Sequence, residues 1–196
     1  MNICDLIKQL EQTQWQKPTL EIPNKPILSR YDLQNFKAPT GDFIAKSSGS
    51  TGIPVVVQRS NLSRAWWIAT NIRETMWFKR NLPLSMAVIR ANITQKFAQN
   101  NWGPFFEMLG YSTGPLYGHP IEGDLTSWLK EVNPHYLFTY PSIVDNLDLS
   151  LLPNLQGIRT TGETLYNRHP LIADTYSAEE VGTIAIQCPD NSSNYH

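Results

Sequence analysis

The sequence is poor in cysteine, in long apolar runs and in net charge, and each shortage excludes a class of protein. Its two cysteines, Cys4 and Cys188, stand near opposite ends of the 196 residues, so neither a disulfide framework nor a site of paired cysteines is expected. No apolar run approaches membrane-spanning length, and the first residues lack the basic and apolar regions of a signal peptide. We therefore expect a cytoplasmic protein that does not use a membrane.

The charge balance and the absence of certain motifs exclude further classes of protein. Sixteen basic residues against seventeen acidic ones leave a formal charge of -1, which gives no electrostatic reason to expect a nucleic-acid partner. The four histidines share no metal-ligand spacing with one another or with the cysteines. There is no GxSxG segment, and no GxGxxG follows an expected strand, which argues against α/β-hydrolase and Rossmann folds. A small-molecule substrate fits this composition best.

What the chain does contain is an alternation of short strands and helices. We expect an amphipathic helix in the first dozen residues and a long helix over residues 60–80. Further helices are expected at 125–132 and 142–147, and strands at 43–46, 55–57, 86–89, 136–139, 157–160, 172–176 and 183–186; residues 100–118 look irregular. This alternation predicts an α/β fold with a mixed, largely parallel sheet flanked by helices.

The loop after the first strand is rich in hydroxyls and glycine. It reads Ser47, Ser48, Gly49, Ser50, Thr51 and Gly52. Glycine lets backbone N–H groups converge on one point, and such nests bind anions, including a phosphate chain. The loop is not a Walker A motif, because the GKS or GKT ending is absent. The same composition also suits a surface loop that joins two strands of a hairpin, and the loop alone does not decide between these interpretations.

Two later segments place similar groups at strand ends. The segment TTGETL covers residues 160–165, and DTYSAEEVG covers residues 174–182. Both put glycine, hydroxyl and carboxylate groups where open α/β sheets bind ligands. Each also has a structural interpretation, in which Thr161 and Glu163 cap a helix and Glu179 and Glu180 are solvated surface acids.

Taken together and in this order, the three segments resemble the adenylate-forming (AMP-binding) superfamily. Within it, the sequence is most similar to the phenylacetate–CoA ligase and coenzyme F390 synthetase-like branch. SSGSTGIP resembles the family's phosphate loop, TTGETL its adenine-side segment, and YSAEEVG its Tyr-Gly-x-Thr-Glu segment. The stretches PILSRYDL at 26–33 and YPS at 140–142 are also similar to this branch.

The resemblance implies a role for each group of residues. Residues 47–52 would hold the β- and γ-phosphates of ATP. The adenine side would be formed by Gly162, Glu163 and Tyr176, with Ser177 and Glu179 in the same nucleotide site. Glu180 would be the catalytic carboxylate and would hold Mg²⁺, a cation that prefers carboxylate and phosphate oxygens. The aromatic residues Trp102, Phe105 and Phe106 would line an acyl pocket, for which plain core packing is the alternative.

The implied reaction is ATP-dependent activation of a small carboxylic acid as its acyl-adenylate. Transfer to a thiol, of CoA or of a carrier protein, would follow. The family's ribose-binding Asp, hinge and C-terminal lid domain with its catalytic Lys have no counterpart in this sequence. We therefore expect residues 1–196 to be an incomplete N-terminal adenylation domain, inactive alone, as part of the family's large α/β domain.

Three departures from the family pattern leave other functions open. Ile53 stands where many relatives have Lys, Ser177 replaces Gly, and Glu179 puts a carboxylate where the family has a Thr hydroxyl. One alternative is a truncated or degenerate module that binds a nucleotide or acyl group without turnover. Another is an interaction protein that keeps the fold and no ligand site.

Overall fold

A computed structural model describes residues 43–46, 56–59, 61–178 and 181–196. The described residues form two compact units. The first contains the described residues up to Asn71 together with Val181 and Gly182, and the second contains Ile72–Ala178 and Thr183–His196. The helix expected in the first dozen residues lies outside the described residues.

The first unit contains a short hairpin ladder and the beginning of the long helix. Strands β1 (Phe43–Lys46) and β2 (Val56–Arg59) pair antiparallel, with Phe43 opposite Arg59. Both strands were expected from the sequence. Helix α3 (Asn61–Trp77) is the predicted long helix, and it ends three residues earlier than expected.

A left-handed turn ends α3 and belongs to the second unit. Lys79 has φ of +48°, its N–H donates to the Met76 carbonyl, and the N–H of Arg80 donates to the Thr75 carbonyl. This is the Schellman pattern, which satisfies carbonyls that the helix itself leaves unpaired. The turn directs the chain back so that the Arg80 side chain reaches Glu74, one turn inside the helix.

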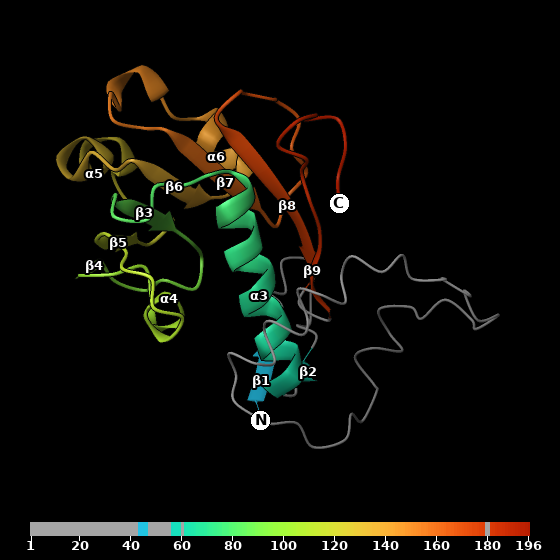
Figure 1. Cartoon of the computed structure of the whole chain (residues 1–196). Coiled ribbons are helices and arrows are strands. Elements are labelled where there is room, and N and C mark those ends of the chain that lie inside the picture. The colour runs from blue at the N-terminus through green and yellow to red at the C-terminus, as the bar shows by residue number, and fades with distance from the viewer. Residues whose placement is uncertain (1–42, 47–55, 60, 179–180) are drawn as a thin grey trace. The chain divides into compact units, whose positions relative to one another are not determined.

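The second unit is built on a seven-stranded sheet with the order β4-β5-β3-β6-β7-β8-β9. Its strands are β3 (Met86–Ile89), β4 (Phe97–Gln99), β5 (Leu116–His119), β6 (Tyr136–Thr139), β7 (Gly157–Thr161), β8 (Ile172–Ala178) and β9 (Gly182–Ile186). The ladders β5–β3, β3–β6, β6–β7 and β7–β8 are parallel, and β4–β5 is antiparallel. The predicted mixed, largely parallel sheet is confirmed (Figure 1).

The expectation of an irregular segment over residues 100–118 was wrong. This segment contains α4 (Pro104–Met108) and most of β5, an interior strand that pairs with β3 and β4. The sequence of β5, LYGH, lacks the apolar alternation that marks a strand. The ring of Phe97 on β4 lies against the backbone of Gly118, since a Cβ there would lie 1.9 Å from it.

The core lies between the sheet and two predicted helices, α5 (Leu125–Val132) and α6 (Pro141–Asp145); a 3₁₀ turn, η1 (Leu149–Leu151), follows α6. Ala87, Leu137, Ile158 and Ile172 are register partners on successive strands, so they form one row on one face. That row belongs to a buried cluster with Trp128 and Leu129 of α5 and Val144 of α6. Because side chains alternate along a strand, Phe138 and Arg159 lie on the opposite face.

Candidate functional site

A cavity of about 500 Å³ lies beside the carboxyl end of β7 and the second half of β8, within the size range of small-molecule pockets. Its lining residues are Gly162, Glu163, Thr164, Leu165, Asp174, Thr175, Tyr176, Ser177, Ala185 and Tyr195. The structure thus brings together Gly162, Glu163, Tyr176 and Ser177. These are the described residues that the sequence assigned to nucleotide binding.

Gly162 begins the loop on one side of the cavity and has φ of +84°. A Cβ at this position would lie 3.2 Å from Cε1 of Tyr140. Glycine suits this position for two reasons. The left-handed backbone conformation disfavours a side chain, and so does the nearby ring of Tyr140. The backbone passes directly along the Tyr140 ring as a result.

Glu163, the next residue, is held by a helix N-terminus. Its Oε2 accepts a hydrogen bond of 3.0 Å from the backbone N–H of Ser142, in the first turn of α6. Such N–H groups have no partner inside the helix, and a carboxylate is favoured there. In the described structure residues 162–171 form no helix, so Glu163 caps α6 rather than a helix of its own.

The other side of the cavity is the end of β8. Tyr176 is 61% exposed, which leaves its aromatic ring available to a ligand. Ser177 follows it, and its hydroxyl lies 2.8 Å from Oγ1 of Thr161 at the end of β7. This bond fixes the ends of the two strands to each other beside the cavity.

Asp174 forms the floor of this side and is almost fully buried, with 6% exposure. Its Oδ1 accepts from the Thr160 hydroxyl at 2.5 Å, and its Oδ2 accepts from the Tyr195 hydroxyl at 2.8 Å. Its backbone N–H donates to the Gln187 side chain at 2.8 Å. Burial and the hydrogen bond to Asp174 raise the pKa of Tyr195 to about 12. The hydroxyl therefore remains a donor over the whole physiological range.

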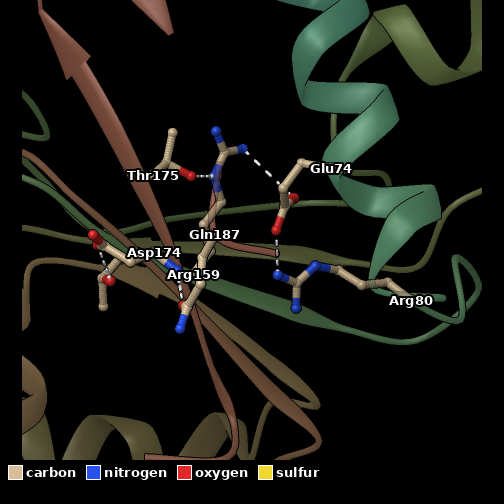
Figure 2. A network of polar contacts seen from close by, with 7 residues as sticks. Glu74, Arg80, Arg159, Asp174, Thr175 and Gln187 are labelled. Atoms are coloured by element: carbon tan, nitrogen blue, oxygen red, sulfur yellow. Dashed lines mark hydrogen bonds and ion pairs between the residues drawn. The ribbon is translucent and has the colours of Figure 1, made fainter. Parts of the chain in front are cut away.

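A buried ion network supports β8 from the opposite face of the sheet (Figure 2). Glu74, 1% exposed, lies 2.5 Å from Nη2 of Arg80 and 3.9 Å from Nη1 of Arg159. Nε of Arg159 donates to the Thr175 hydroxyl at 3.4 Å, one residue before Tyr176. Burial lowers the pKa of Arg159, and the Glu74 carboxylate partly offsets this. Sequence reasoning missed this network, because no local pattern marks partners so far apart in the chain.

The remaining predicted site residues fall elsewhere. The indole N–H of Trp102 donates to the Leu84 carbonyl at 3.0 Å, and its ring makes edge contacts with Phe106 and Tyr136. Trp102, Phe105 and Phe106 are half-buried and are not among the described residues that line the cavity; their place in an acyl pocket stays a prediction. The predicted phosphate loop, residues 47–52, lies outside the described residues, as do Glu179 and Glu180.

The described residues contain no group of three or more His, Cys, Asp or Glu side chains that could hold a metal ion. None of the described helices has the length and apolar character needed to cross a membrane.

Neither a family model nor a curated protein matches the sequence, whereas solved structures do. An open conformation of 2-hydroxyisobutyryl-CoA ligase, in complex with 2-HIB-AMP and CoA, matches 87% of the chain with 16% identity and a TM-score of 0.52. An amide bond synthetase from Marinactinospora thermotolerans matches 77% with 13% identity and a TM-score of 0.46. An AMP-forming acyl-CoA synthetase-like protein from Dyadobacter fermentans matches 78% with 18% identity and a TM-score of 0.45.

The chain spans 47%, 32% and 46% of these three proteins, in that order. At 16% identity the first match establishes a shared fold. The sheet described above therefore has the architecture of part of a CoA ligase.

Proposed function

We propose that this chain binds ATP and takes part in activating a small carboxylic acid as its acyl-adenylate, in the manner of the adenylate-forming superfamily. The observation that carries the proposal is the meeting of Gly162, Glu163, Tyr176 and Ser177 in one cavity. These residues come from TTGETL and YSAEEVG, which resemble the family's adenine-side segment and its Tyr-Gly-x-Thr-Glu segment. The shared fold with a CoA ligase supports the same function.

The cavity suits a flat heterocycle. Tyr176 offers an exposed aromatic ring, and stacking of a base on such a ring contributes about 1–3 kcal/mol. Across the cavity lining, Gly162 has no side chain, so the ring of a bound base can approach its backbone closely. Tyr195, anchored on Asp174, contributes a second aromatic wall. A planar base with polar edges matches this mixture of aromatic surface and hydrogen-bonding groups.

The phosphate side of the proposed site depends on the resemblance alone. Residues 47–52 would supply N–H and hydroxyl donors to the β- and γ-phosphates, and Glu180 would hold Mg²⁺. Catalysis of phosphoryl chemistry is mainly positioning and neutralisation of charge. The acyl group would then pass to a thiol, of CoA or of a carrier protein. Assignment to the phenylacetate–CoA ligase-like branch likewise depends on the sequence motifs.

Calorimetric titration of the purified chain with Mg-ATP and Mg-GTP tests the proposal. We expect saturable binding of ATP and at least about tenfold weaker binding of GTP, because the two bases present different polar edges to the same cavity. Absence of saturable ATP binding would contradict the proposal. Pyrophosphate release in the presence of a panel of small acids then separates an activating enzyme from a module that binds without turnover.

A further inference from the structure

Arg90 directly follows β3 and has no acidic partner in the described structure. Its guanidinium lies over the rings of Tyr140 and Phe138, 4.5 Å and 5.0 Å from their centroids. Nη1 is buried and has no hydrogen-bond partner, while the residue as a whole is half-buried. A buried, unpaired nitrogen of a charged group is unfavourable, so one in a folded protein calls for an explanation, such as a ligand that pairs with it.

Two more buried polar atoms without a hydrogen-bond partner lie at the ends of neighbouring strands. Besides Nη1 of Arg90, Nε2 of His119 and Oγ1 of Thr139 are buried without a hydrogen-bond partner. These residues end or follow β5, β3 and β6, which are neighbours in the sheet. Because the three strands are parallel, their carboxyl ends share one edge. The three residues therefore share the carboxyl edge of the sheet, with Arg90 on the face of Phe138 and with His119 and Thr139 on the core face.

This edge is also where the strand order reverses. From β3 the chain proceeds to β5 on one side, then crosses by α5 to β6 on the other side of β3, and continues outward to β7 and β8. Open α/β sheets bind ligands outside the carboxyl ends of the strands at such a switch point. Arg90 and Tyr140 are the residues that directly follow the two strands flanking it.

A single ring connects Arg90 to the cavity. Tyr140 has its ring under the Arg90 guanidinium and within 3.2 Å of a Cβ position at Gly162, which lines the cavity. The Tyr140 hydroxyl accepts from the N–H of Ala91 at 3.3 Å, so the ring is held against the turn that follows β3. A molecule that reaches from the cavity past Tyr140 therefore meets a guanidinium.

We infer that Arg90 binds a second anionic group of the acid substrate, so that the preferred substrates are dicarboxylic acids or acids with another anionic substituent. This inference rests on the proposed function. A guanidinium pairs bidentately with a carboxylate or phosphate group. The reacting carboxylate is a poor partner, because it loses its charge on activation and strong pairing would stabilise the ground state. A second anionic group keeps its charge throughout.

Calorimetry with length-matched acids tests this inference on the purified chain. The pairs are malonate and propanoate, succinate and butanoate, glutarate and pentanoate, and adipate and hexanoate. We expect the diacid of at least one pair to bind about 10- to 100-fold more tightly, the range typical of hydrogen bonds to a charged group. Arg90→Met should abolish that preference, and Arg90→Lys should keep part of it. Lys130→Met, which removes an exposed cation on α5, should leave it unchanged.

Equal affinities for diacid and monoacid in every pair would overturn the inference, as would a preference that survives Arg90→Met. Equal weakening of both acids in Arg90→Met would assign Arg90 to the reacting carboxylate and overturn it as well. If Arg90→Met does not fold, the diacid and monoacid affinities of the wild-type chain and of Arg90→Lys test the inference. AMP titrated into the same samples is an independent readout. Failure of AMP to bind the wild-type chain counts against the proposed function, whereas loss of the diacid preference alone counts against the role of Arg90.

Discussion

The hydroxyl of Tyr195 lies 2.8 Å from Oδ2 of Asp174, and this bond joins two segments that both line the cavity. The second carboxylate oxygen accepts from Thr160, so strand β7, strand β8 and the segment after β9 meet at one buried carboxylate. The aromatic wall formed by Tyr195 is held in place by this bond rather than by packing alone, since Tyr195 itself is 39% exposed.

Tyr195→Phe should lower the free energy of unfolding by about 1 kcal/mol, because it leaves one oxygen of the buried Asp174 without a donor while the ring is kept. Urea titration followed by tryptophan fluorescence measures the change. Tyr166→Phe is the matched control, since Tyr166 is 82% exposed and should change stability by less than about 0.5 kcal/mol. Equal effects of the two substitutions would contradict the structural role of the bond.

Burial of Tyr195 and its bond to Asp174 together predict a loss of stability at alkaline pH. The pKa of Tyr195 is about 12 in the folded chain and about 10 in an unfolded chain. A raised folded pKa gives stability that is complete below pH 10 and is lost as the pH rises towards 12, because only the unfolded chain then releases the proton. The difference in unfolding free energy between wild type and Tyr195→Phe should therefore shrink between pH 9 and pH 11. A constant difference would show that the hydroxyl does not titrate as described.

Glu74→Gln should destabilise the fold by about 3 kcal/mol, because two guanidiniums then lose the buried carboxylate that both contact. Thermal unfolding followed by circular dichroism checks this. Glu131→Gln on α5 removes the same charge from an exposed position and should have almost no effect. A Glu74→Gln variant as stable as Glu131→Gln would mean that the ion network contributes no stability.

Gly162→Ala and Gly110→Ala separate backbone strain from contact with Tyr140. Both glycines have φ near +80°, and alanine in that region costs about 1 kcal/mol or more. A Cβ at Gly110 meets nothing within 4 Å, whereas one at Gly162 meets the Tyr140 ring. We expect both variants to be destabilised and only Gly162→Ala to lose nucleotide affinity, measured by titration with AMP. Loss of affinity in both variants would point to a general effect of stability.

The elements with a clear local pattern could be predicted from the sequence. Strands β3 and β6 and helix α5 have the predicted bounds, because the two strands are short, mostly apolar runs and the apolar residues of α5 recur with the helical period. Strand β5 could not be predicted, because LYGH is neither an apolar run nor an apolar alternation and its pairing with β3 and β4 is made only in the folded sheet.

The candidate site was predictable only in part, for a similar reason. Gly162, Glu163, Tyr176 and Ser177 stand at strand ends, where the rule for open sheets directs attention. Tyr195 enters the cavity through its bond to Asp174, and Arg90 is singled out by the rings of Phe138 and Tyr140. These pairings are tertiary, so no spacing in the sequence marks them. Arg90 is also the residue on which the inferred preference for diacids depends.

The most direct test of the central claim is photolabelling of the purified chain with 8-azido-ATP, followed by peptide mapping with mass spectrometry. If the cavity holds adenine, the label should fall on residues 162–165 or 174–177, excess ATP should prevent it, and Tyr176→Ala should reduce it at least about tenfold. Label that ATP does not displace, or label that falls elsewhere with Tyr176→Ala unaffected, would contradict an adenine site between β7 and β8.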